Sequence, residues 1–129
     1  MNRPAREWIA KAEGDYATAL RELRARKNPN YDAACFHAQQ CIEKYLKGIL
    51  QARHIGFART HDLSLLLDAS LGQFPLWEPF RPDLEMLTQY AIAFRYPGET
   101  ATKAEARQAV ATATKLRNVF RTTVKRRTR

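Results

Sequence analysis

Residues 31–53, YDAACFHAQQCIEKYLKGILQAR, decide the fold. Two apolar rows run through this segment at steps of three and four residues, the spacing of side chains that share one side of an α-helix. The first row is Ala34, Ala38, Cys41, Tyr45 and Ile49, and the second is Cys35, Ile42, Leu46 and Leu50. Two adjacent apolar rows predict a helix that is buried over a wide arc, as the central helix of a bundle would be.

Four other segments also have a helical period, and none alternates as a strand would. We expect helices over about 4–26, 62–71, 82–94 and 102–124. Asn28-Pro29-Asn30 ends the first of these helices, and Thr102-Lys103-Ala104-Glu105 is a capping box that opens the last. The pattern predicts an all-α protein, an antiparallel up-and-down helical bundle of about five helices over residues 1–124, followed by a basic tail over 125–129.

Length and composition agree with one globular domain that has no membrane span. The chain has 129 residues and is 45% hydrophobic and 27% charged. No stretch longer than ten residues lacks Asp, Glu, Lys and Arg, and the first residues form no apolar signal region. Cys35 and Cys41 are too few for a disulfide scaffold and are predicted to be reduced core residues. We therefore expect a cytoplasmic protein.

The positive charge is concentrated near the C-terminus. The chain carries a formal net charge of +9, and residues 115–129 hold seven cations and no acid. The other 114 residues hold 15 cations and 13 anions, a net charge of +2. Such an arm suits a polyanion, either RNA or the acidic face of a partner protein. The alternative is a solvated helix end whose cations favour the helix dipole.

One polar row on the 31–53 helix is a candidate phosphate-binding site. His37, Gln40, Lys44, Lys47 and Gln51 follow steps of three and four and therefore share a face. Two lysines, an imidazole and an amide on one face could bind phosphate oxygens. The alternative is a solvent-exposed face, which Glu43 and Lys47 would stabilise at the i,i+4 spacing.

Two short motifs elsewhere carry further candidate residues. Arg95-Tyr96 precedes Pro97-Gly98, where Arg95 could bind a ligand or cap the end of its helix. His61-Asp62 stands at a helix entry, where His61 could titrate near neutral pH and Asp62 could serve the helix N-terminus. His37 and Cys41 have the spacing of two metal ligands, but nothing supplies a third, so no metal and no cofactor is predicted.

Four motifs together resemble the HEPN family (higher eukaryotes and prokaryotes nucleotide-binding). The run from Phe36 to Leu50, FHAQQCIEKYLKGIL, is similar to the signature helix of that family. Thr60-His61-Asp62-Leu63 resembles its entry to the third helix, and Arg95-Tyr96-Pro97 resembles the motif that closes the fourth. The opening helix has the similar form Trp8, Ala12, Asp15, Ala19. The resemblance covers about residues 4–122.

The resemblance implies an antiparallel helical bundle that forms a homodimer. It also implies a minimal nucleotidyltransferase as partner protein, in a two-component module of toxin–antitoxin type. Many members are metal-independent RNases with an Arg-x4-6-His site. This chain has no such spacing, since seven residues separate Arg53 from His61.

The sequence therefore predicts a nucleotide- or RNA-facing binding module that pairs with a nucleotidyltransferase. The predicted phosphate-binding residues are Lys44, Lys47, Arg95, Gln40 and His37. The alternative is a metal-independent endoribonuclease toxin whose Arg/His site is drawn from Arg95, His61 and Arg53. The two functions are distinguished by whether Arg95 and His61 converge in a groove at the dimer seam, with Lys44 or Lys47 nearby. The many aromatic residues around 57–96 are predicted to serve the core or a dimer interface.

Overall fold

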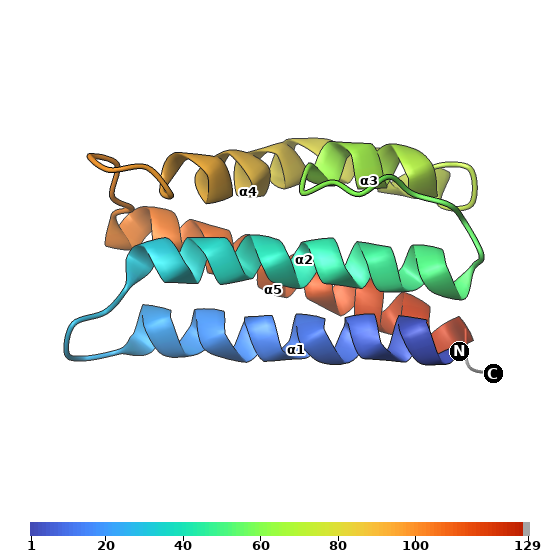
Figure 1. Cartoon of the computed structure of the whole chain (residues 1–129), viewed down its shortest axis with the longest axis horizontal. Helices are drawn as coiled ribbons and strands as arrows, with labels where there is room; N and C mark the ends of the chain where they lie inside the picture. The colour runs from blue at the N-terminus through green and yellow to red at the C-terminus, as the bar shows by residue number, and fades with distance from the viewer. Residues whose placement is uncertain (128–129) are drawn as a thin grey trace.

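The chain folds as a bundle of α-helices, seen in a computed structural model that describes residues 1–127. The helices are α1 (Arg3–Arg24), α2 (Tyr31–Ala52), α3 (Leu63–Ser70), α4 (Arg81–Ala93) and α5 (Lys103–Arg127). A short 3-10 helix, η1 (Pro75–Phe80), precedes α4, and residues 1–127 contain no strand. The long helices α1 and α2 run side by side, α5 packs behind them, and α3 and α4 form a layer on the other side of α2 (Figure 1). The predicted all-α bundle is confirmed.

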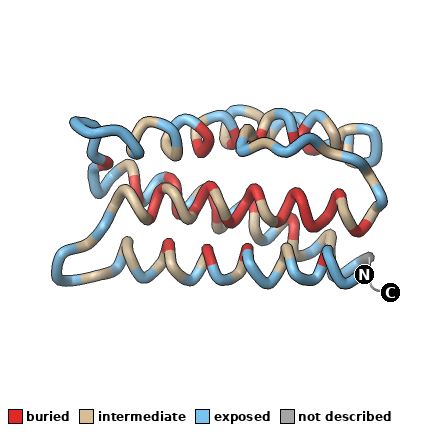
Figure 2. Tube along the Cα trace, viewed as in Figure 1, coloured by how far each residue is buried: buried red, intermediate tan, exposed pale blue. Residues whose placement is uncertain are grey.

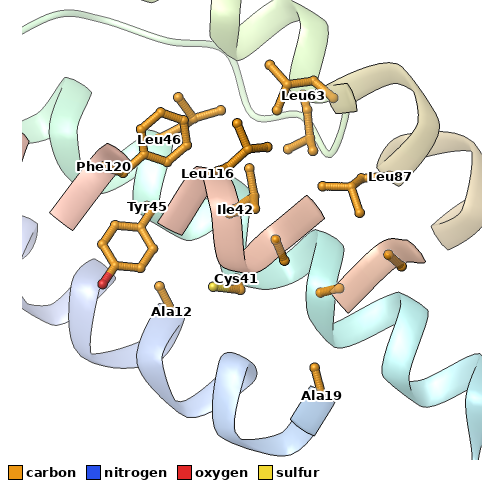
Figure 3. Close-up of a cluster of buried hydrophobic side chains, with 14 of the residues drawn as sticks. Ala12, Ala19, Cys41, Ile42, Tyr45, Leu46, Leu63, Leu87, Leu116 and Phe120 are labelled. Atoms are coloured by element: carbon orange, nitrogen blue, oxygen red, sulfur yellow. The ribbon is translucent and has the colours of Figure 1, made fainter. Parts of the chain in front are cut away.

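Helix α2 is the centre of the bundle and contacts α1, α3, α4 and α5. Buried positions follow it along most of its length, whereas α1 is buried on one side only (Figure 2). Both predicted apolar rows lie in the core. Tyr45, Ile42 and Leu46 of α2 meet Leu116 and Phe120 of α5 within one cluster of buried side chains (Figure 3). The wide apolar arc of α2 therefore positions every other helix.

Side-chain caps define where the helices begin. The side chain of Asn2 accepts from the Ala5 backbone N–H, and that of Asn30 accepts from Ala33 at the start of α2, both at 2.9 Å. At α5 the predicted capping box is formed. The Thr102 hydroxyl accepts from the Glu105 N–H at 3.1 Å, and the Glu105 carboxylate accepts from the Thr102 N–H at 2.9 Å.

A polar link joins the three long helices. The Arg117 guanidinium of α5 donates two hydrogen bonds to the Glu13 carboxylate of α1, at 2.6 and 2.7 Å, and the Tyr45 hydroxyl of α2 donates to the same group. The hydrogen bonds from Arg117 lower the pKa of Glu13 below its usual value. This bidentate ion pair fixes the register of α1 against α5.

Several details refine the predicted elements. Residues 125–127, assigned above to a basic tail, continue α5, while 128 and 129 lie outside the described residues. Cys35 and Cys41 are free and buried, as predicted. Burial raises the pKa of the Cys35 thiol to about 12. Within residues 1–127, no helix has the length and apolar character needed to cross a membrane.

Gly48 allows α1 and α2 to approach closely. A Cβ atom at Gly48 would lie 2.8 Å from Ile9 Cδ1 and 3.2 Å from Trp8 Cβ. Gly14 of α1 offers the opposite case, because a Cβ there would meet no atom within 4 Å. Comparing alanine substitutions at these two glycines therefore distinguishes the effect of steric crowding from that of helix propensity.

We expect Gly48→Ala to be less stable than Gly14→Ala by about 1–3 kcal/mol, because the Ile9 side chain must change its conformation and Trp8 must move slightly to admit the methyl group. Gly14→Ala should stabilise the fold by about 0.5–1 kcal/mol through helix propensity alone. Urea denaturation midpoints of both variants and the parent measure this difference. A Gly48→Ala variant as stable as the Gly14→Ala variant would show that the helices are not in close contact there.

Candidate functional site

A cavity lies where α2, α3 and α4 meet. It has a volume of about 540 Å³. The polar residues that line it are Gln39 and Gln40 of α2, His61, Asp62 and Ser64 around the start of α3, and Glu85, Thr88, Gln89 and Arg95 on or after α4. Phe36, Ala91 and Ile92 supply apolar surface. Convergent polar groups on an apolar wall are typical of a small-molecule site.

Arg95 and His61 line this same cavity, although 34 positions separate them in the sequence. The connection 94–102 turns away after Arg95, and Gly98 takes a positive φ of 89° there. Within residues 1–127, the Arg95 guanidinium forms no hydrogen bond or ion pair. It therefore does not cap its helix through its side chain, and its charge is available to an anion.

His61 is held firmly although its side chain is 78% exposed. Its Nδ1 lies 3.0 Å from Oε1 of Glu43, and its backbone carbonyl accepts from the Gln39 amide at 2.9 Å. The next residue, Asp62, caps α3 by accepting from the Ser64 N–H at 2.9 Å. The ring is thus placed at the mouth of the cavity by α2 and by the first turn of α3.

Lys44 and Lys47 do not join Arg95 at the cavity, so the three cations predicted to share one groove are not brought together. Lys44 Nζ lies 2.6 Å from Oδ2 of Asp15 on α1. Lys47 is buried, with Nζ 2.9 Å from Oε2 of Glu43 and 5.4 Å from the centre of the Trp8 ring. The alternative of a solvated Glu43–Lys47 pair is also wrong, since both side chains are buried.

The other predicted phosphate-binding residues lie nearer to Arg95. Gln40 lines the cavity. His37 lines a shallower neighbouring hollow that shares Phe36 and Arg95 with it. The Nδ1 atom of His37 lies 2.8 Å from Asp15 Oδ1, so its ring is oriented by α1. Gln40, His37 and Arg95 therefore lie along one edge of the α2–α4 interface.

Arg53, the third residue of the alternative site, lies elsewhere. It follows the end of α2, donates to Gln73 at 3.1 Å and covers the Phe74 ring at 4.8 Å. Among the aromatic residues, the predicted core role is confirmed for Trp77, and a role at a dimer interface stays a prediction. Trp77 is buried and stacks on Phe74, whereas Tyr96 is 64% exposed.

Gln39 and Glu43 also belong to this site, although neither was predicted as a site residue. Glu43 is 3% exposed, accepts from Gln39, Gln40 and Lys47, and has one carboxylate oxygen 3.0 Å from His61 Nδ1. A signal existed, because Gln39, Glu43 and Lys47 follow one another at i,i+4 beside the apolar rows. The burial of Gln39, Glu43 and Lys47 becomes clear only in the folded structure, where the entry to α3 packs against α2.

Comparisons with known proteins match this architecture. The family model for the HEPN domain matches residues 5–123. The solved structure of TT1696 from Thermus thermophilus is 28% identical, with a TM-score of 0.78 over 94% of this chain and 98% of that one. The structure of ST0689, an archaeal HEPN homologue, is 27% identical, with a TM-score of 0.68 over 96% and 99%. No curated protein matches the chain significantly.

Proposed function

The chain belongs to the HEPN domain family, and from that premise we propose that it is a nucleotide- or RNA-binding module whose ligand occupies the α2–α3–α4 cavity. The observation that carries the proposal is the guanidinium of Arg95, which lines the cavity and makes no ion pair or hydrogen bond within residues 1–127. An unpaired guanidinium can bind phosphate oxygens in a bidentate manner.

The rest of the cavity suits the other parts of a nucleotide. Phe36 and Ile92 offer apolar surface to a base, and Gln40, Gln89 and Ser64 offer amide and hydroxyl groups to its polar edge. Two carboxylates, Asp62 and Glu85, also line the cavity. They disfavour more than one phosphate group inside the cavity and favour a single nucleotide unit there that presents hydroxyl or amino donors beside one phosphate.

The proposal includes assembly. We propose a homodimer and a partner protein, a minimal nucleotidyltransferase, in a two-component toxin–antitoxin-like system. Exposed apolar side chains next to the cavity support a protein contact there. Leu65 of α3 is 52% exposed, Ile92 of α4 is 47% exposed, and Ile92 lines the cavity itself. Copurification with a nucleotidyltransferase encoded by a neighbouring gene tests the second partner.

One observation favours a second candidate function, metal-independent cleavage of RNA. The Glu43–His61 contact orients an imidazole at the mouth of the cavity that Arg95 also lines. An imidazole nitrogen can accept the proton of a ribose 2′-hydroxyl, and a guanidinium can stabilise charge that develops on the phosphate. Lys47 does not line the cavity, and it is connected to His61 only because both side chains contact Glu43.

The first test of this site is the variant Arg95→Ala. We expect about ten- to one-hundred-fold weaker binding of a short single-stranded RNA, because a charge-assisted hydrogen bond to phosphate is lost. The salt dependence of binding should also become shallower by about one phosphate contact. Fluorescence anisotropy over a salt series measures both quantities. Arg24→Ala, on exposed α1 sequence, is the matched control, and equal loss in both variants would contradict the proposed site.

A second expectation concerns self-association. The chain should be an isologous two-fold dimer at about 10–50 µM, in the range of ordinary interface affinities. Leu65→Asp should shift it towards monomer, because a charge would be buried against the partner. Leu76→Asp, at an 86% exposed position in η1, should leave the dimer intact. Light scattering measures the mass, and a monomeric parent protein would exclude this assembly.

Cleavage separates the two candidate functions. We expect the purified protein to bind single-stranded RNA in excess chelator without cutting it. Robust chelator-resistant cleavage that is lost in both His61→Ala and Arg95→Ala would instead establish the endoribonuclease function. Gel analysis of an end-labelled RNA measures it, with circular dichroism to show that each variant is folded. Cleavage that survives both substitutions would come from a different site or from a contaminant.

A further inference from the structure

The buried carboxylate of Glu43 connects α2 to the entry of α3. Its Oε1 atom lies 3.0 Å from His61 Nδ1 and 3.1 Å from the Gln39 amide nitrogen, and its Oε2 atom lies 2.9 Å from Lys47 Nζ. A buried carboxylate needs such partners because water cannot solvate it. Together with the Gln40 amide, 3.4 Å from Oε1, three of these groups come from α2, and within residues 1–127 only His61 comes from another part of the chain.

The identity of these partners determines which nitrogen of His61 carries the proton. Lys47, whose side chain is 8% exposed, supplies an ammonium group that pairs with the ionised form of Glu43. An ionised carboxylate only accepts hydrogen bonds, so His61 Nδ1 must be the donor. In the neutral imidazole the proton is then on Nδ1, and Nε2 keeps its lone pair.

The orientation of the ring is fixed by a second contact. The Gln39 amide donates to both Glu43 Oε1 and the His61 carbonyl, at 3.1 and 2.9 Å. Gln39 and Glu43 are one helical turn apart and therefore hold the backbone and the ring of His61 together. Because Nδ1 faces the buried carboxylate and the side chain is 78% exposed, Nε2 lies on the accessible side of the ring.

We infer that Glu43 is a positioning residue that holds His61 in its Nδ1–H tautomer and so presents an unprotonated Nε2 to ligands of the cavity. The tautomer follows from the contacts above, whereas its use by a ligand rests on the proposed function. The group that fits Nε2 is a hydrogen-bond donor, such as a ribose hydroxyl, placed beside a phosphate that Arg95 binds.

The chain contains its own references for a spectroscopic test. It has three histidines, and His37 makes the corresponding contact to Asp15, with Lys44 as the paired ammonium. His54 is exposed, and its ring makes no hydrogen bond within residues 1–127. Long-range ¹H–¹⁵N spectra at about pH 8.5, where an ordinary imidazole is neutral, distinguish the two ring nitrogens of each histidine.

We expect His61 and His37 to show a protonated Nδ1 and an unprotonated Nε2, in contrast to a tautomer mixture at His54. Glu43→Leu, which removes the acceptor, should return His61 to a mixture like that of His54 and leave His37 unchanged. Asp15→Leu is the matched control and should do the reverse. Because Glu43→Leu leaves the buried Lys47 ammonium unpaired, the same spectra are recorded for Glu43→Leu combined with Lys47→Met. A parent protein in which His61 carries its proton on Nε2, or a His61 tautomer unchanged in both Glu43 variants, would overturn the inference.

Binding of a short single-stranded RNA, measured on the same samples, separates this inference from the proposed function. In the Glu43 variants we expect about fivefold weaker binding, the value of one misoriented hydrogen bond. A protein with the Nδ1–H tautomer at His61 that binds no RNA would retain the positioning role and contradict the proposed function. Binding of RNA with the proton on Nε2 would retain the function and contradict the positioning role.

Discussion

A carboxylate inside a small bundle must be surrounded by donors, and Glu43 imposes this requirement on the centre of the molecule. Lys47, one turn further along α2, supplies one donor, and the Trp8 ring of α1 covers the Lys47 ammonium. His61, in the segment that leads into α3, contacts the other carboxylate oxygen. The packing of Trp8 on α2, the end of the 53–62 connection and the His61 side of the cavity are therefore all linked to one buried charge.

The helices were predictable because their determinants are local. Apolar rows at steps of three and four define α2, and Asn30 and the Thr102–Glu105 box mark helix starts through contacts that span three residues. The 3-10 helix η1 was not predicted. It contains Pro75 and Pro79, which are unfavourable in a regular helix, yet this segment packs Trp77 into the core against Phe120.

The site was predictable only in part, because its geometry depends on contacts between distant segments. Arg95 and His61 were identified by motif, but their place in one cavity requires α4 to lie beside the entry of α3. Lys47 was misjudged for a related reason. A lysine on a polar helical row is usually solvated, and its burial here follows from Trp8 and Glu43, 39 and 4 positions away.

The contact between Glu13 and Arg117 can form only after α5 has been synthesised, since 104 positions separate the two residues. Helices α1 and α2 are neighbours in sequence and can pair as a hairpin while later segments are still being synthesised. That hairpin leaves the α5-facing side of α2, including Ile42 and Tyr45, without Leu116 and Phe120. The nascent chain therefore has an uncovered apolar surface until α5 is made. We expect it to be most prone to aggregation before α5 packs against α2.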